Sequence, residues 1–305
     1  MRHSIGLPTD HVEHAAEFVT GDAVMEMAAA AEAAGFDAVF VTDHPAPDAK
    51  WLAAGGHHAL EPMVALSFAA AATTTLRVQT HIMVLAYRNP FLAAKAVLSL
   101  DVLSRGRVIL GVASGYLKPE FGALGVDFEE RNELTDEAID VMRAVWTTDD
   151  VAWQGRHFSS RGVTMRPRPP NAGGPPIWIG GNSTAAIRRA VERGQGWVPF
   201  PNPRSASRAV RTAEIATIDD LARGIDLMHE LAAERGRTDP LDVCFSPFDR
   251  QGPGVRDEVE QLASVGVTWS VLGVDATSRA EWIDRMRALA ATLQLTPARS
   301  AHPEP

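Results

Sequence analysis

The stretch Asp37-Ala38-Val39-Phe40-Val41-Thr42-Asp43-His44 is the part of the sequence that decides the predicted fold. Its apolar run, 38–41, contains β-branched and aromatic side chains that do not alternate with polar ones. Such a run is typical of a strand buried on both faces, as in a parallel sheet. A helical pattern over 22–34 precedes it, and prolines follow it. The stretch therefore predicts a strand that ends at Asp43 and His44.

The same alternation of helix-like and strand-like segments continues along the whole chain of 305 residues. Eight such units predict an α/β fold, and specifically a (β/α)8 TIM barrel. A doubly wound sheet is the alternative, but no strand is followed by a G-x-G-x-x-G turn. The expected strands are 4–7, 38–41, 77–83, 107–112, 177–179, 196–200, 241–245 and 268–272, and the expected helices are 22–34, 61–73, 91–103, 132–147, 183–193, 218–235, 254–265 and 278–293.

Four connections are too long to be plain turns. Three of them follow strands two, four and six, at 43–60, 113–131 and 200–217. The carboxyl ends of all the parallel strands lie at the same face of a barrel. These three insertions are therefore the expected active-site loops. The fourth, 151–176, precedes strand five and begins with a hairpin-like pattern on the opposite face or the side.

Composition limits both the domain organisation and the class of partner. We expect one barrel domain over 1–295 and a disordered polar tail over 296–305. No apolar run is long enough for a membrane span, and the net charge of −9 disfavours nucleic acid and anionic membranes as partners. The single cysteine, Cys244, excludes an internal disulfide and fits a cytoplasmic protein. A small-molecule substrate and a homodimer are expected.

Polar residues at the carboxyl end of a barrel strand lie where TIM-barrel enzymes carry out chemistry. Asp43 and His44 are therefore expected in the active site, and the alternative is a loop pair that caps the next segment. An unperturbed histidine, with a pKa of about 6.5, can gain or lose a proton near neutral pH. His44 is the residue that we predict to be catalytic, as a proton carrier or an electrostatic partner of a bound ring.

Three further motifs fit either a ligand site or ordinary structure. Gly180-Gly181 lies between a strand and a helix, where backbone N–H groups can bind a phosphate or simply form a tight turn. The segment 113–116, at the end of strand four, suits a flat ligand or a glycine turn with a packing tyrosine. Thr80 and His81 are polar residues inside an apolar strand, either as core residues or as ligand contacts. The His57-His58 pair is not expected to bind a metal, and no other metal site is expected.

Together these motifs resemble the luciferase-like monooxygenase family over nearly the whole chain. Within the family they are most similar to the branch that uses the deazaflavin coenzyme F420. The resemblance rests on the order and spacing of Val41-Thr42-Asp43-His44, Tyr87-Arg88-Asn89-Pro90 with Ala93-Ala94-Lys95, Leu103-Ser104-Arg105-Gly106-Arg107, Gly111-Val112-Ala113-Ser114-Gly115-Tyr116, Phe128-Glu129-Glu130-Arg131 and Pro176-Ile177-Trp178-Ile179-Gly180-Gly181.

The resemblance implies a ring that lies across the carboxyl-end mouth of the barrel. It also implies a strand-three bulge with a cis peptide bond between His81 and Ile82. The implied cofactor contacts are Asp43 and His44 after strand two, Thr80, His81 and Ile82 in strand three, Ser114, Gly115 and Tyr116 after strand four, and Gly180, Gly181 and Asn182 at the phosphate turn.

The activity implied by the resemblance is hydride transfer between F420 and a small organic substrate. An FMN-dependent monooxygenase that uses reduced flavin and O2 is one alternative, and a non-catalytic flavin-binding barrel is another. F420-dependent sugar-phosphate dehydrogenases carry a glutamate near the position of Tyr116 and basic residues for the sugar phosphate. This chain shows neither feature, which argues against that substrate and leaves the acid/base partner unassigned.

Overall fold

The strands of this protein close into a parallel barrel, as the sequence predicts. The computed structural model describes residues 1–203, 212–250, 252 and 254–296. Each strand pairs with the next along the chain, and β8 pairs with β1 to close the ring. The strands are β1 (Arg2–Gly6), β2 (Ala38–Val41), β3 (Arg77–Val84), β4 (Val108–Ala113), β5 (Ile177–Gly180), β6 (Gly196–Val198), β7 (Asp242–Phe245) and β8 (Trp269–Leu272).

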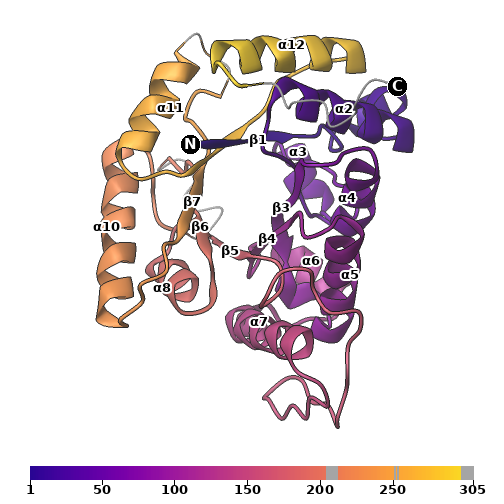
Figure 1. Ribbon diagram of the computed structural model, residues 1–305, viewed down its shortest axis with the longest axis vertical. Coiled ribbons are helices and arrows are strands. Elements are labelled where there is room, and N and C mark those ends of the chain that lie inside the picture. The colour runs from indigo at the N-terminus through magenta and orange to yellow at the C-terminus, as the bar shows by residue number, and fades with distance from the viewer. Residues whose placement is uncertain (204–211, 251, 253, 297–305) are drawn as a thin grey trace.

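Helices surround the strands as an outer ring (Figure 1). The eight long helices agree with the predicted ranges to within two residues at either end. They begin at conventional signals: Thr20, Asn89 and Ser278 each accept a hydrogen bond from the first turn. The long helices are α2 (Gly21–Ala34), α4 (Pro62–Ala71), α5 (Pro90–Leu103), α7 (Arg131–Thr147), α8 (Thr184–Arg193), α10 (Ile218–Glu234), α11 (Val255–Ser264) and α12 (Arg279–Thr292).

Short helices in the loops were not expected from the sequence. The insertion after β2 contains α3 (Ala49–Ala53), and the insertion after β4 contains α6 (Lys118–Ala123) and the 3-10 helix η3 (Phe128–Glu130). Each is too short to show a helical period, so pattern alone cannot identify it. Other short helices are η1 (Val12–His14), α1 (Ala15–Phe18) and η2 (Leu85–Tyr87).

The insertion before β5 projects beyond α7 at the foot of Figure 1. Antiparallel bridges join Val151 to Val163 and Gln154 to Ser159, which confirms the expected hairpin-like pairing. The expected insertion over 200–217 lies partly outside the described residues, and so does all of the expected tail except Thr296.

Apolar side chains fill two separate layers. Inside the barrel, Trp178 and Trp269 meet edge to face with ring centroids 5.2 Å apart, and Phe40 lies in the same cluster. A larger cluster lies between the strands and the helices. A third, smaller cluster includes Phe121 and Phe128 and holds α6 in place beside the barrel mouth.

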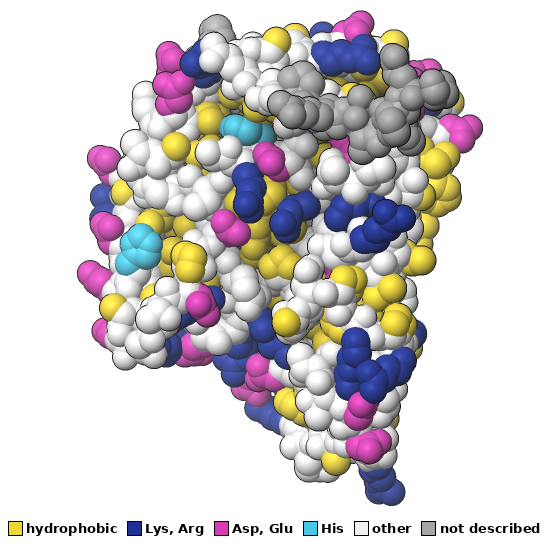
Figure 2. Space-filling view, viewed as in Figure 1, with side chains coloured by type: hydrophobic (Ala, Val, Ile, Leu, Met, Phe, Trp, Pro, Cys, Tyr) yellow, Lys and Arg dark blue, Asp and Glu magenta, His cyan; other side chains and the backbone are white. Residues whose placement is uncertain are grey.

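The surface mixes charges of both signs. Figure 2 shows Lys and Arg interspersed with Asp and Glu on the face seen in Figure 1, with apolar side chains between them. Ion pairs such as Arg168 with Asp149, at 2.7 Å, lie at the base of the projecting insertion. Within the described residues no helix has the length and apolar character needed to cross a bilayer.

A bulge in β3 depends on a glycine in the neighbouring strand. The register between β3 and β4 shifts between Thr80 and Met83, so that His81 and Ile82 leave the regular ladder. The peptide bond between these two residues is cis, as the family resemblance implies. Opposite the bulge lies Gly111, where an added Cβ would come within 2.2 Å of the Thr80 carbonyl oxygen.

We therefore expect Gly111→Ala to destabilise the barrel. The Thr80 oxygen belongs to the backbone and the new Cβ is fixed directly to the backbone of the paired strand, so relief requires the strands to move. Overpacking of this kind costs roughly 1–3 kcal/mol or more, measurable as a lower free energy of unfolding in urea. Gly122→Ala is the control, because an added Cβ there meets nothing within 4 Å. Equal stabilities for the two variants would contradict this account of the bulge.

Candidate active site

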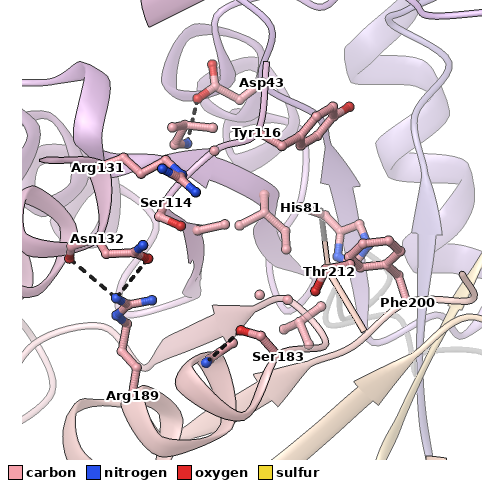
Figure 3. Close-up of a pocket in the computed structure, with 18 of the residues that line it drawn as sticks. Asp43, His81, Ser114, Tyr116, Arg131, Asn132, Ser183, Arg189, Phe200 and Thr212 are labelled. Carbon is pink, nitrogen blue, oxygen red and sulfur yellow. Dashed lines mark hydrogen bonds between the residues drawn. The ribbon is translucent and has the colours of Figure 1, made fainter. Parts of the chain in front are cut away.

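A cavity of about 440 Å³ opens where strands β2 to β6 end. All the predicted site residues except Thr80 and Asn182 line it: Asp43, His44, His81, Ile82, Ser114, Gly115, Tyr116, Gly180 and Gly181. These residues are far apart in the sequence and meet only because parallel strands end on one face of the barrel. Figure 3 shows Arg131, Asn132 and Arg189 along one side of the cavity and Tyr116 and His81 away from them.

Thr80 and Asn182 have structural partners instead. The Thr80 hydroxyl donates to the Gly111 carbonyl at 2.7 Å, which ties the bulge to β4. The Asn182 amide donates to the carbonyl oxygens of Phe200 and Ala213, and its own carbonyl oxygen accepts from the Phe200 N–H at 3.0 Å. Both side chains therefore hold the walls of the cavity in position.

Asp43 is held in a buried ion pair. Its two carboxylate oxygens accept from the Arg88 guanidinium at 2.7 and 3.0 Å, and one of them also accepts from the Val84 N–H at 2.9 Å. Burial acts to lower the pKa of Arg88, but the charges and hydrogen bonds of Asp43 and Glu61 together outweigh it, and the pKa is raised. Asp43 thus connects the end of β2 to the segment that follows β3, at the edge of the cavity.

His44 is paired with a carboxylate that the sequence did not reveal. Its Nδ1 lies 3.4 Å from Oε2 of Glu120, whose side chain is fully buried. Glu120 also accepts from the Tyr87 hydroxyl at 2.7 Å and from the Ala46 N–H at 3.2 Å. Burial acts to raise the pKa of Glu120, but the hydrogen bonds from His44, Tyr87 and Ala46 lower it overall. Glu120 is therefore a carboxylate at neutral pH.

Aromatic and imidazole rings surround His44. Its ring centroid lies 4.4 Å from that of Trp51 and 4.9 Å from that of His57, and Tyr116 lies at 6.1 Å. Nε2 of His57 forms a hydrogen bond with the Thr42 hydroxyl at 3.2 Å, and the tautomer of His57 decides which of the two is the donor. Burial and the neighbouring His44 lower the pKa of His57. Trp51 comes from α3, whose presence the sequence did not show.

His81 is an uncharged imidazole in the cavity wall. Burial, together with the positive charge of Arg250, lowers its pKa to about 3. Its Nδ1 lies 3.5 Å from the Gln79 amide nitrogen, and the Gln79 carbonyl oxygen accepts from the Ser4 hydroxyl at 2.9 Å. His81 therefore belongs to a polar chain that runs through the barrel interior, and it contributes no charge to the site at neutral pH.

The opposite end of the cavity suits an anion. Gly180 and Gly181 lead to the N-terminus of α8, where Ser183 caps the helix through the Ala186 N–H at 3.2 Å. Arg131 and Arg189 also line this end. Helix N-termini and guanidinium groups are the usual donors to phosphate. Across the described residues, no group of three or more His, Cys, Asp or Glu side chains could hold a metal ion.

Sequence reasoning missed Glu120, His57 and Arg189 as site residues. Glu120 is separated from His44 by 76 positions, and His57 occurs in a glycine-rich loop without periodicity. Arg189 lies on α8 and reads from the sequence as a surface charge, but its side chain donates to Asp136 at 2.5 Å and is buried. The only sequence signal for Glu120 and His57 is their position in long loops, which does not identify a partner, and Arg189 on its helix has no such signal.

The model of the luciferase-like monooxygenase family matches residues 1–248 of the chain. The chain belongs to this family. It is therefore an enzyme of the luciferase-like type, as the motifs in its sequence indicate. The cavity described above is at the carboxyl-end mouth, where the family resemblance places the cofactor ring.

Relatives and solved structures agree with this assignment. An F420-dependent glucose-6-phosphate dehydrogenase of Amycolatopsis mediterranei is 30% identical over 79% of this chain and 76% of its own length. A monooxygenase structure from Streptomyces bottropensis covers 96% of this chain and 99% of its own, with a TM-score of 0.75 and 19% identity. The F420-dependent tetrahydromethanopterin reductase of Methanopyrus kandleri covers 96% and 98%, with a TM-score of 0.72 and 16% identity. At these identities the two structures show a shared fold.

The low pKa of His81 makes stability depend on pH. The folded protein binds a proton at His81 only near pH 3, whereas an unfolded histidine binds it near 6.5. Stability is therefore lost progressively as the pH falls below about 6.5, by up to roughly 1.4 kcal/mol per pH unit for one proton. Urea unfolding of His81→Gln should show a shallower loss. His229→Gln, on an exposed face of α10, is the control, and parallel profiles for His81→Gln and wild type would contradict the prediction.

Proposed function

We propose that this protein transfers a hydride between the deazaflavin coenzyme F420 and a small organic substrate. The observation that carries the proposal is the buried pair of His44 and Glu120 beside a cavity whose far end suits a phosphate. The cofactor assignment is supported by the relative from Amycolatopsis mediterranei, which is named F420-dependent. The same cavity could serve FMN, so an FMN-dependent monooxygenase is the second candidate, supported by the family description.

The residues at the anionic end fit the phosphate that both cofactors carry. An added Cβ at Gly180 would come within 2.2 Å of the Ile82 side chain, and Gly181 has a φ of +118° that few other residues adopt. The backbone can therefore approach a ligand closely at this turn. Ser183 and the N-terminus of α8 would hold the phosphate, and Arg131 would add positive charge. The Gly181 N–H donates to the Val198 carbonyl at 3.2 Å and so sets the path of the turn.

The other end of the cavity would perform the proton chemistry. Bound deazaflavin supplies a carbon that accepts or releases a hydride. When a hydride moves to or from a carbon that bears oxygen, one proton must also leave or join the substrate. His44 lines the cavity beside the buried Glu120 carboxylate, and histidine is the side chain that most often transfers protons in enzyme sites. The Trp51 and Tyr116 rings would limit access of water to it.

The cofactor can be identified by direct titration. We expect the purified protein to bind F420 more tightly than FMN in a fluorescence titration. Gly181→Ala should weaken binding by about 10- to 100-fold, because a Cβ at this φ disturbs backbone donors to a charged group. Gly125→Ala is the control, since Gly125 also has a positive φ, of +69°, but lies in open space. Tighter binding of FMN would favour the second candidate.

His44→Ala tests the proton-transfer role. We expect turnover with F420 to fall by about 10²- to 10⁴-fold while the affinity for the coenzyme stays nearly unchanged. His229→Ala, at an exposed position on α10, should retain wild-type turnover. If instead binding weakens and turnover at saturation is preserved, His44 positions the ring and does not carry the proton.

Several expectations from the sequence remain predictions. The homodimer is among them, and the sequence assigns neither the substrate nor the direction of hydride transfer. The departure from sugar-phosphate dehydrogenases at Tyr116 stays a prediction; the carboxylate that contacts His44 is that of Glu120, four positions further along the chain.

A further inference from the structure

Glu120 is a carboxylate in a buried position, where a charge is energetically unfavourable. Its side chain has no exposed surface, and α6, which carries it, packs through Phe121 against the small cluster beside the barrel mouth. Removing a carboxylate from water costs several kcal/mol unless partners compensate. Two of its three partners, the Ala46 N–H at Oε1 and the Tyr87 hydroxyl at Oε2, are neutral donors, and neither requires a charged acceptor. The negative charge itself matters most to His44.

The two nitrogens of His44 have different surroundings. Nδ1 faces Glu120, at 3.4 Å from Oε2. Because an ionised carboxylate can only accept, the hydrogen of a neutral imidazole lies on Nδ1 in this arrangement. Nε2 makes no hydrogen bond to any described residue, and it is not fully buried. Its lone pair is therefore accessible from the cavity that His44 lines.

We propose that Glu120 is a positioning residue that fixes the Nδ1–H tautomer of His44 and stabilises the imidazolium formed when Nε2 accepts a proton. The inference rests on the proposed hydride transfer and supplies the acid/base partner that the motifs left unassigned. Tyr87 holds the same carboxylate oxygen at 2.7 Å and so keeps it directed at His44. Burial and the neighbouring carboxylates, Glu120 foremost, raise the pKa of Tyr87, so it remains a donor.

The protons balance when the substrate is an alcohol that is oxidised to a carbonyl compound, or the reverse. In the oxidising direction the substrate C–H bond breaks and its electron pair leaves with the hydride to the deazaflavin. The O–H bond of the hydroxyl group on that carbon also breaks, and its proton goes to Nε2 of His44. The resulting imidazolium keeps its Nδ1–H on Glu120, which stays ionised throughout. In the reducing direction the same proton returns to the substrate oxygen.

Several titratable groups contribute to the field at His44. Glu120 favours the protonated imidazole, whereas a protonated His57 would oppose it. Burial and the Glu120 charge raise the pKa of Tyr116, so this phenol is neutral beside His44. Tyr87 on η2 acts on Glu120 of α6, and Glu120 acts on Tyr116 after β4. His58 before α4 and Asp10 after β1 act on His57.

The first test is histidine ¹⁵N NMR on the wild-type protein without added cofactor. The two tautomers of a neutral imidazole give different ¹⁵N shifts, and His44→Gln identifies the resonances. We expect Nδ1 of His44 to be protonated and Nε2 to be the nitrogen that titrates. Finding the hydrogen on Nε2 of neutral His44 would overturn the proposal without any variant of Glu120.

The second test is Glu120→Gln. The Ala46 N–H can only donate, so it should retain the amide oxygen and leave the NH₂ group facing Nδ1 of His44. His44 should then adopt the Nε2–H tautomer, its protonation should move to lower pH, and turnover should fall by about 10²-fold or more. Affinity for F420 should stay within about twofold, because Glu120 does not line the cavity.

Tyr87→Phe is the matched control. It removes a hydrogen bond from the same carboxylate oxygen but leaves the charge, so the tautomer of His44 should be unchanged and turnover should fall less than in Glu120→Gln. If Glu120→Gln and Tyr87→Phe lose turnover equally while both keep the wild-type tautomer, Glu120 is only structural. The NMR outcome is independent of F420, so failure of the proposed function would appear as absent turnover with the expected tautomer still present.

Discussion

Closure of the parallel barrel is the constraint on which the rest of this structure depends. Once β8 pairs with β1, all eight strands end on the same side, and every residue that follows a strand is directed there. No segment carries the site alone: β2, β3, β4 and β5 each contribute a few residues to one cavity. Closure also removes free strand edges, so the backbone hydrogen bonds of the ring are satisfied internally.

Buried charges at the mouth are held by specific partners, and these partners also organise the loops. Asp43 binds Arg88 and thereby fixes the connection after β3, whereas Glu120 binds Tyr87 and Ala46 and thereby fixes α6 against the loop after β2. Each carboxylate compensates for its desolvation by accepting several hydrogen bonds. The same contacts that stabilise the loops therefore also place His44 at the cavity.

Most of the fold could be predicted from local pattern. Runs such as 38–41 and the capped helices have periods and end signals that depend only on neighbouring residues, and their boundaries are correct to within two residues. Local pattern left His81 and Gly181 open between a ligand site and ordinary structure, and the family resemblance implied the cofactor role; both residues line the cavity. Pattern could not reveal α3 and α6, because each is shorter than two helical periods and depends on tertiary contacts.

The sequence by itself determined the order of the elements, the closed barrel that this order implies, and the family to which the chain belongs. Only the tertiary structure decided which polar groups are partners. Asp43 is next to His44 in the chain, but its carboxylate accepts hydrogen bonds from Arg88. The carboxylate that contacts His44 is that of Glu120. The physical reason is that hydrogen bonds between side chains depend on distance and direction in space. Spacing along the chain does not encode either quantity once the residues lie in separate loops.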